Sequence, residues 1–218
     1  LDTLHVLADD LARLGIPLHV LHVPKFADAP QALVELARAT AATAILFNDE
    51  YPLNERVRDS NVRNACTAAG LGVRVHAASS ILPPGTLLTT SGSPYTVFSP
   101  FKRRWLATVD VAALAPLPPP RPQSGPPIAA AALPAAIDGV RRGQGAARLW
   151  PGGAAEAHRR LARFLAEAVL HYHAKRDLPA RPGTSQLSPY LAIGAISARE
   201  CLHAAVRANG GRLAGGDP

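Results

Sequence analysis

Three hydroxyl side chains crowd into five positions of segment 176–200, RDLPARPGTSQLSPYLAIGAISARE. They are Thr184, Ser185 and Ser188, and an apolar segment follows them directly. The start of a helix uses one side chain as its N-cap, which accepts a hydrogen bond from a free backbone N–H group. The spacing therefore indicates that some of these hydroxyls do something other than cap a helix.

Helix capping accounts for two serines of the segment. Ser188 precedes Pro189, a pattern that predicts an N-cap followed by proline at the first helical position, and Gly194 predicts the end of that short helix. Ser197 and Glu200 have the spacing of a capping box that opens the next helix. Both serines are thereby explained as structural residues.

Thr184 and Ser185 remain, in a loop that begins at Gly183 and runs toward a helix N-terminus. Backbone N–H groups, the positive end of a helix dipole and hydroxyl donors together make an anion site. A phosphate or diphosphate group fits this loop, and an ordinary Ser/Thr-rich turn explains it equally well.

Other motifs in the chain carry weaker chemical signals. The phosphate-binding loops G-x-G-x-x-G and G-x-x-x-x-G-K-[ST] are absent from the sequence. His171 and His173 are two positions apart, which on a helix directs them to opposite sides, so we expect no metal site there. The run FKRRW at 101–105 mixes aromatic and basic residues as a nucleic-acid surface does. Ser99 and Pro100 before it predict instead the capped start of an amphipathic helix.

The segment NDEYPLNERVRD, residues 48–59, follows an expected parallel strand. Ligands of open α/β sheets bind in such loops, beyond the carboxyl ends of the strands. Asn54 can cap the following helix, and Glu55 lies in its first turn, where a carboxylate is favoured. Capping explains both residues, and a ligand site is the second interpretation.

The elements that must position these residues change in character along the chain. Residues 1–110 alternate between helix and strand patterns, which is typical of a parallel α/β sheet. Residues 111–136 hold eight of the 21 prolines, mixed with alanine, and predict an extended linker. A helical pattern follows, with one apolar face made by Leu161, Leu165, Ala168 and Tyr172. Strands are expected at 16–23, 43–49 and 71–77, and helices at 4–15, 29–40, 54–70 and from Ser99 onward.

Composition and charge limit the class of protein. The chain is 48% apolar and 18% charged, and it lacks a long uncharged apolar run, so we expect a globular protein without a membrane span. Cys66 and Cys201 make no disulfide framework and no metal-binding pair, which suits the reducing cytoplasm. We expect a monomer. Between Arg141 and Arg207 there are eleven Lys/Arg and four Asp/Glu, against twelve of each elsewhere. This local excess favours a polyanion such as nucleic acid as partner over a general bias toward arginine.

Several motifs together are distinctive. Y-x-x-x-R-D-x-P, G-T-S-x-L-S-P-Y-L and G-x-I-S-x-R-x-C-L occur in that order after W-P-G-G and a helix, and NERVRD, ILPPG and VFSPFKRRW lie in the first half. Over essentially its whole length the chain resembles the DNA photolyase/cryptochrome family, and within it the folate-type class I cyclobutane pyrimidine dimer photolyases. The resemblance implies a Rossmann-like parallel sheet in an antenna-binding α/β domain (1–110). A Pro/Ala-rich linker (111–145) and the start of an all-α FAD- and DNA-binding domain (146–218) follow.

The resemblance also implies roles for individual residues. Asn54 and Glu55 match residues that hold the antenna, 5,10-methenyltetrahydrofolate, although relatives with a deazaflavin antenna share the fold. Arg176 matches a position that contacts the DNA backbone. Gln186 stands where many relatives carry arginine, but the family contact there is largely through the backbone. Contacts with FAD, chiefly with its phosphates, are expected at Tyr172, Thr184, Ser185, Gln186, Leu187 and Ser188.

The implied function is light-driven DNA repair. The helical domain would bind damaged DNA and flip the pyrimidine dimer out of the duplex, and electron transfer from photoexcited reduced FAD would split the dimer. A cryptochrome-type photoreceptor with the same flavin site is the alternative. A third interpretation treats the first 110 residues as a nucleotide-binding module joined to an unrelated helical adaptor.

The ends of the chain bear on completeness. The sequence contains no methionine and begins inside a helical pattern at Leu1. The resemblance places the first strand of the family before Leu1, and the lesion pocket and the tryptophan electron relay beyond Pro218. We therefore expect a fragment without catalytic residues of its own, which alone neither holds FAD firmly nor repairs DNA.

Overall fold

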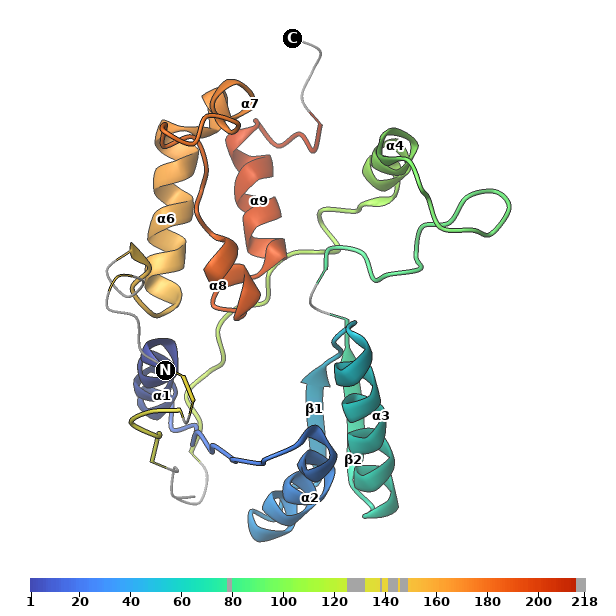
Figure 1. The fold of residues 1–218 in the computed structure, drawn as a ribbon, viewed down its shortest axis with the longest axis vertical. Helices are drawn as coiled ribbons and strands as arrows, with labels where there is room; N and C mark the ends of the chain where they lie inside the picture. The colour runs from blue at the N-terminus through green and yellow to red at the C-terminus, as the bar shows by residue number, and fades with distance from the viewer. Residues whose placement is uncertain (78–79, 125–131, 138, 141–144, 146–148, 215–218) are drawn as a thin grey trace. The chain divides into compact units, whose positions relative to one another are not determined.

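The computed structural model describes residues 1–77, 80–124, 132–137, 139–140, 145 and 149–214. The chain forms two compact units (Figure 1). An α/β unit comprises Pro17–Pro83 and Ser124–Ala132, and a helical unit comprises Leu1–Ile16, Pro84–Gln123 and Leu133–Pro218. Part of the linker expected at 111–145 lies outside the described residues, and the expected domain bounds stay a prediction.

The α/β unit is built on two parallel strands. β1 (Ala44–Asn48) pairs in parallel with β2 (Gly72–His76), with Ala44 opposite Gly72 and Asn48 opposite His76. The helical elements of this unit are η1 (Phe26–Asp28), α2 (Ala29–Ala39) and α3 (Leu53–Ala68). The small parallel sheet with helices confirms the α/β class expected for this part of the chain.

Packing of the α/β unit follows the alternation of its strands. α2 and α3 lie side by side against the sheet (Figure 1), and Val34 of α2 meets Val62 and Cys66 of α3 in a buried core. Ile45 and Phe47 of β1 pack against this core, while the alternate residues Ala44, Leu46 and Asn48 are exposed. The helices therefore cover the face of the sheet on which the odd-numbered residues of β1 lie.

The strand expected at 16–23 is not formed, and that prediction is wrong. A strand is held by hydrogen bonds to a neighbouring strand, so an apolar alternation is not sufficient for it. Among the described residues, the strands β1 and β2 pair only with one another. Residues 16–23 have the pattern of a strand without the partner that would make it one.

The helical unit gathers elements from both ends of the chain. Its elements are α1 (Asp2–Arg13), α4 (Phe98–Thr108), α6 (Ala154–Glu167), η2 (Val169–His171), α7 (Tyr172–Lys175), α8 (Ser188–Ala192) and α9 (Ala198–Ala208). Its buried core is made by Ala157, Leu161, Leu187, Tyr190, Ile196 and Ala204. None of the helices that the structure describes has the length and apolar character needed to cross a membrane.

The helical pattern after residue 153 is interrupted. α6 ends at Glu167, and Ala168 has a φ of −128°, which turns the chain out of the helix. Leu161 is buried and Leu165 packs against the core, as their spacing predicts, but Tyr172 starts α7 instead of continuing the same face.

The capping box predicted at Ser197 is confirmed. The Ser197 hydroxyl accepts a hydrogen bond from the Glu200 backbone N–H at 3.1 Å, and the Ser197 N–H donates to Glu200 Oε2 at 2.8 Å. The cap predicted at Ser188 is wrong, because Ser188 is already the first helical residue. Leu187 occupies the cap position in a helical backbone conformation and brings no side-chain acceptor.

The caps predicted at Asn54 and Ser99 are also wrong. α3 begins at Leu53 because Pro52, in extended conformation, takes the cap position two residues before Asn54. α4 begins at Phe98 because extended Val97 takes that position before Ser99. Glu55 does lie in the first turn of α3, as predicted.

Ser188 and Ser197 of the helical unit make a matched pair for measurement. We expect Ser197→Ala to lower the free energy of unfolding by about 1 kcal/mol, because it removes the acceptor of a capping box. Ser188→Ala removes no cap bond and should cost less than about 0.5 kcal/mol. Urea unfolding of the flavin-free protein checks both values, and equal costs would contradict the assignment of the caps.

Candidate functional site

The loop between α7 and α8 carries Thr184 and Ser185, the two hydroxyl residues to which no helix cap was assigned. Thr184 is exposed, Ser185 is half-buried, and Leu187 is buried in the core of the helical unit, where it anchors the end of the loop. Within the part of the chain that the structure describes, the hydroxyls and backbone N–H groups of Thr184 and Ser185 make no hydrogen bond. Four donors on two consecutive residues are therefore free to meet an acceptor.

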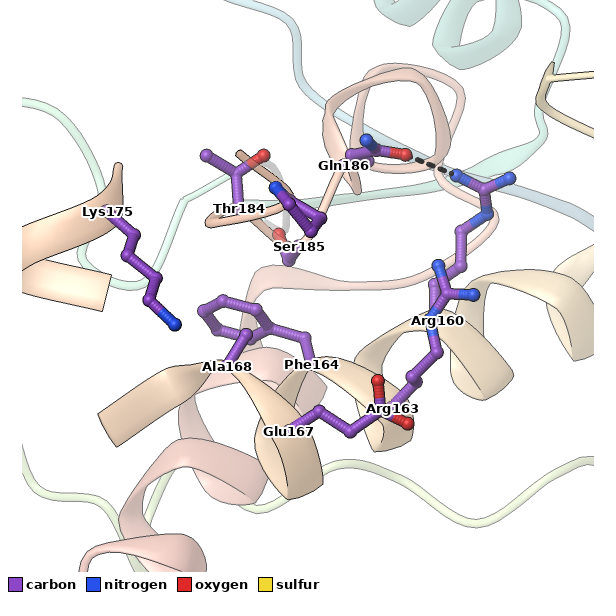
Figure 2. A pocket seen from close by; sticks show the side chains of 10 residues that line it. Arg160, Arg163, Phe164, Glu167, Ala168, Lys175, Thr184, Ser185 and Gln186 are labelled. Atoms are coloured by element: carbon purple, nitrogen blue, oxygen red, sulfur yellow. Dashed lines mark hydrogen bonds between the residues drawn. The ribbon is translucent and has the colours of Figure 1, made fainter. Parts of the chain in front are cut away.

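Gln186 gives this loop its shape. Its φ is +53°, in the left-handed region that a residue other than glycine rarely adopts. The side chain accepts a hydrogen bond from Arg160 Nη1 at 3.1 Å (Figure 2). Strained backbone persists only where its surroundings hold it, and in this loop the buried Leu187 and the bond from Arg160 do so.

Gly183 permits the close approach of the loop to α7. A Cβ atom at this position would lie 2.6 Å from the Lys175 carbonyl oxygen, which is inside the contact distance of real side chains. The glycine that precedes Thr184 is therefore required by packing, and it brings Lys175 beside the loop.

A cavity of about 330 Å³ lies between this loop and the helix α6. Figure 2 shows Arg160 and Arg163 from α6, Lys175 from α7, and the loop residues Thr184 and Ser185 around it. The wall carries three cationic side chains and one carboxylate, that of Glu167, so it attracts anions. The lining residues are Arg160, Arg163, Phe164, Glu167, Ala168, Lys175, Pro182, Thr184, Ser185 and Gln186.

Arg160 is held from several sides. Its side chain is 9% exposed and its Nε donates to Glu156 Oε1 at 2.7 Å, one turn earlier on α6. Its Nη2 donates to the Leu149 carbonyl, and the guanidinium lies over the Tyr190 ring, 5.6 Å from the centroid. A buried guanidinium bonded at each of its three nitrogens is a fixed part of the scaffold.

Glu156 completes the ion pair. Hydrogen bonds from Arg160 lower the pKa of the Glu156 carboxyl most, and bonds from Arg159 lower it further, although burial acts in the opposite direction. The carboxylate lies in the first turn of α6, where the helix dipole also favours a negative charge.

The structure brings three of the predicted FAD residues together at the cavity, namely Thr184, Ser185 and Gln186. Tyr172 lies beside it, where its ring makes an edge-to-face contact with the ring of the lining residue Phe164, at a centroid distance of 5.8 Å. The side chain of Leu187 points into the core, and Ser188 is exposed outside the cavity lining. Neither side chain lines the cavity, and the contacts of Leu187 and Ser188 with FAD stay a prediction.

Arg176 lies at the end of α7 and is half-exposed, with 54% of its side chain accessible. The guanidinium stands over the Tyr172 ring, 5.8 Å from the centroid, and its Nε is 3.4 Å from Asp177 Oδ2. His171 and His173 are exposed neighbours, and no cluster of three metal-ligating side chains occurs among the described residues.

Asn54 and Glu55 lie in the α/β unit, in the first turn of α3 after the carboxyl end of β1. Asn54 is exposed and Glu55 is half-buried. The loop before them is held by Asp59, whose Oδ2 accepts the Glu50 backbone N–H at 3.2 Å, and by Arg58, which donates to Glu50 Oε2 at 2.8 Å. The two predicted antenna residues are therefore presented by a fixed turn.

Sequence reasoning missed the cationic wall of the cavity. The signal was present in the local basic excess and in the i, i+3 spacing of Arg160 and Arg163 along α6. Lys175 carries no comparable signal, because its place at the cavity depends on how the chain folds back at Gly183.

The ion pair predicts an acid-dependent loss of stability. The pKa of Glu156 is lowered in the folded protein, so the stability it contributes is complete above its unfolded pKa of about 4.5. That contribution disappears as the pH falls through the lower, folded-state pKa. We expect urea unfolding between pH 6 and pH 3 to show a flatter pH dependence for Glu156→Gln.

Glu167→Gln is the matched control for this measurement, because Glu167 lies on the same helix and is exposed. It should leave the slope of the wild-type protein unchanged. Equal slopes for Glu156→Gln and the wild type would contradict the assignment of the ion pair.

Comparisons with known proteins extend these observations. A family model described as DNA photolyase matches residues 1–123. The chain is 34% identical over 204 residues to a deoxyribodipyrimidine photo-lyase of Vibrio cholerae, an alignment that covers 90% of this chain and 42% of that protein. It is also 30% identical over 179 residues to cryptochrome-1 of Arabidopsis thaliana, with 81% of this chain and 26% of that protein covered.

A solved structure agrees with the sequence matches. The crystal structure of a bacterial class III photolyase from Agrobacterium tumefaciens is similar, with a TM-score of 0.77 and 29% sequence identity. The match covers 93% of this chain and 42% of that structure. The chain thus spans about two fifths of the length of the photolyases to which it is similar here.

Proposed function

The chain belongs to the DNA photolyase/cryptochrome family, and on this basis we propose that the full-length protein splits cyclobutane pyrimidine dimers in DNA with the energy of light. The observation that carries the proposal is the loop at Thr184 and Ser185, whose free donors face a cavity lined by Arg160, Arg163 and Lys175. A diphosphate is the acceptor that such a set of donors and charges fits.

We propose that this diphosphate belongs to FAD. The hydroxyls and N–H groups of Thr184 and Ser185 would donate to its oxygens, and Arg163 and Lys175 would balance its charge. Phe164 and the adjoining Tyr172 offer aromatic surface to the rest of the cofactor. When bound in its reduced form, FAD supplies the photoexcited electron that opens the cyclobutane ring.

DNA binding is proposed for the basic part of the helical unit. Arg176 is half-exposed, and its contact with Asp177 is long, so its guanidinium can turn to a phosphate. The basic excess of residues 141–207 would add a salt-dependent attraction for the DNA backbone. A dimer in the duplex pairs poorly, which lowers the cost of flipping it out.

An antenna is proposed at the first turn of α3. Asn54 and Glu55 follow the carboxyl end of a parallel strand, the place where open α/β sheets take ligands. The segment NERVRD supports 5,10-methenyltetrahydrofolate, with a deazaflavin as the alternative.

A photoreceptor of the cryptochrome type is the second candidate, favoured by the match to cryptochrome-1 of Arabidopsis thaliana. It would use the same flavin site for signalling without repair. An unrelated helical adaptor is disfavoured, because the match to the Vibrio cholerae photolyase covers 90% of the chain and so includes most of both units.

Repair distinguishes the candidates. The full-length protein with FAD, mixed with DNA that contains thymine dimers, should remove the dimers under blue light and leave them intact in the dark. Dimer loss is measured by an antibody to the lesion or by chromatography. Bound FAD without a difference between light and dark would favour the photoreceptor and contradict the repair proposal.

The FAD site itself is tested by its hydroxyls. We expect Thr184→Ala combined with Ser185→Ala to raise the FAD dissociation constant about tenfold or more, because two hydrogen bonds to a charged acceptor are lost. Ser91→Ala, which removes an exposed hydroxyl outside the cavity lining, should leave the dissociation constant unchanged. Fluorescence titration of the full-length apoprotein with FAD measures both, and equal affinities would contradict the proposed contact.

A further inference from the structure

Among the cations of the helical unit that the structure describes, Arg160 is unusual because it is buried and bonded at every nitrogen. The residue is 8% exposed, whereas its neighbours Arg159 and Arg163 on α6 are exposed. Nε donates to Glu156, Nη1 to Gln186, and Nη2 to the Leu149 carbonyl. Because all its nitrogens are already bonded, this side chain cannot move to follow a ligand.

The bond to Gln186 links α6 to the loop 26 residues later in the chain. Gln186 has a φ of +53°, and it directly follows the two residues with the free donors, Thr184 and Ser185. In the alternative, ordinary backbone conformation of residue 186, the N–H groups before it would point elsewhere. The side-chain bond therefore bears on where the donors of the loop are aimed.

The other side of the guanidinium is equally fixed. Arg160 lies over the Tyr190 ring, and the Tyr190 hydroxyl donates to the Pro151 carbonyl at 2.9 Å. Tyr190 is 2% exposed, so this aromatic support is part of the core. The guanidinium of Arg160 thus links four parts of the helical unit, namely α6, the segment at Leu149 and Pro151, the loop and α8.

We propose that Arg160 is a positioning residue of the cofactor site, which holds Gln186 in its left-handed conformation and so keeps the donors of Thr184 and Ser185 directed into the cavity. This inference rests on the proposed function, because it takes the diphosphate of FAD as the ligand of that cavity. Arg160 acts through Gln186, while the exposed Arg163 and Lys175 supply positive charge at the cavity.

The test compares Arg160→Gln with Arg159→Gln in the full-length protein. Both arginines bond to Glu156, Arg159 through its Nε at 2.8 Å, but only Arg160 reaches the loop. We expect Arg160→Gln to raise the FAD dissociation constant about tenfold and Arg159→Gln to change it less than about twofold. We also expect Arg160→Gln alone to shift the ³¹P resonances of bound FAD.

A purely structural role for Arg160 would lower the unfolding temperature but leave the ³¹P resonances and the affinity of the folded protein unchanged. Gln186→Leu separates a positioning role of Arg160 from a purely structural one. It breaks the link to the loop but removes no buried charge, since Gln186 is exposed. It should weaken FAD binding and shift the ³¹P resonances, while the folded apoprotein loses less in unfolding temperature than Arg160→Gln does, because only one hydrogen bond is removed. It also provides the test if Arg160→Gln does not fold.

Combining Arg160→Gln with Gln186→Leu completes a double-mutant cycle. If Arg160 acts through Gln186, Arg160→Gln with Gln186→Leu should bind FAD no more weakly than Arg160→Gln alone, and additive losses would overturn the inference. Wild-type affinity and ³¹P resonances in Gln186→Leu would overturn it as well. A wild-type protein that binds no FAD would instead overturn the proposed function.

Discussion

The ion pair between Glu156 and Arg160 is the interaction on which the helical unit depends. Both side chains are about nine-tenths buried, so each charge has lost most of its water and requires the other. Removal of one partner from a buried pair typically costs about 3–5 kcal/mol. Because the guanidinium also bonds to Leu149 and Gln186, the need to satisfy one buried charge fixes the loop and the segment before α6 together.

The same constraint explains how the loop at Thr184 and Ser185 keeps its shape although its donors are unbonded within the described part of the chain. Backbone N–H groups that are to bind an anion cannot also be used in the hydrogen bonds of a helix or sheet. A segment with such free donors is therefore not stabilised by its own backbone hydrogen bonds. Here the order comes from outside the loop, from Leu187 in the core, Gly183 against α7 and Arg160 at Gln186. A preorganised set of donors binds with less loss of conformational entropy than a mobile one. In the function proposed above the chemistry belongs to the cofactor, and the contribution proposed for these residues is to hold it in place.

The sequence predicted those features that local signals determine. The capping box at Ser197 depends on residues three positions apart, and it was placed correctly. Features decided by distant partners were not predicted. Residues 16–23 have a strand pattern but pair with no strand in the part of the chain that the structure describes. The role proposed for Arg160 depends on its bond to Gln186, 26 residues away. The three wrong caps, at Ser188, Asn54 and Ser99, failed because the backbone conformation of a preceding residue such as Pro52 decides where a helix begins. The motifs indicated the family and the loop, whereas the cationic wall of the cavity could be recognised only from the three-dimensional structure.

Hydrogen–deuterium exchange of the full-length apoprotein, with and without FAD, tests most directly whether the loop is the binding wall for the cofactor. The amides of Thr184 and Ser185 donate to no group among the described residues, so they should exchange quickly without FAD. On addition of FAD their exchange should slow strongly, while that of Asn54 and Glu55 in the α/β unit stays unchanged. Saturation with FAD that leaves the exchange of Thr184 and Ser185 unaltered would contradict the account.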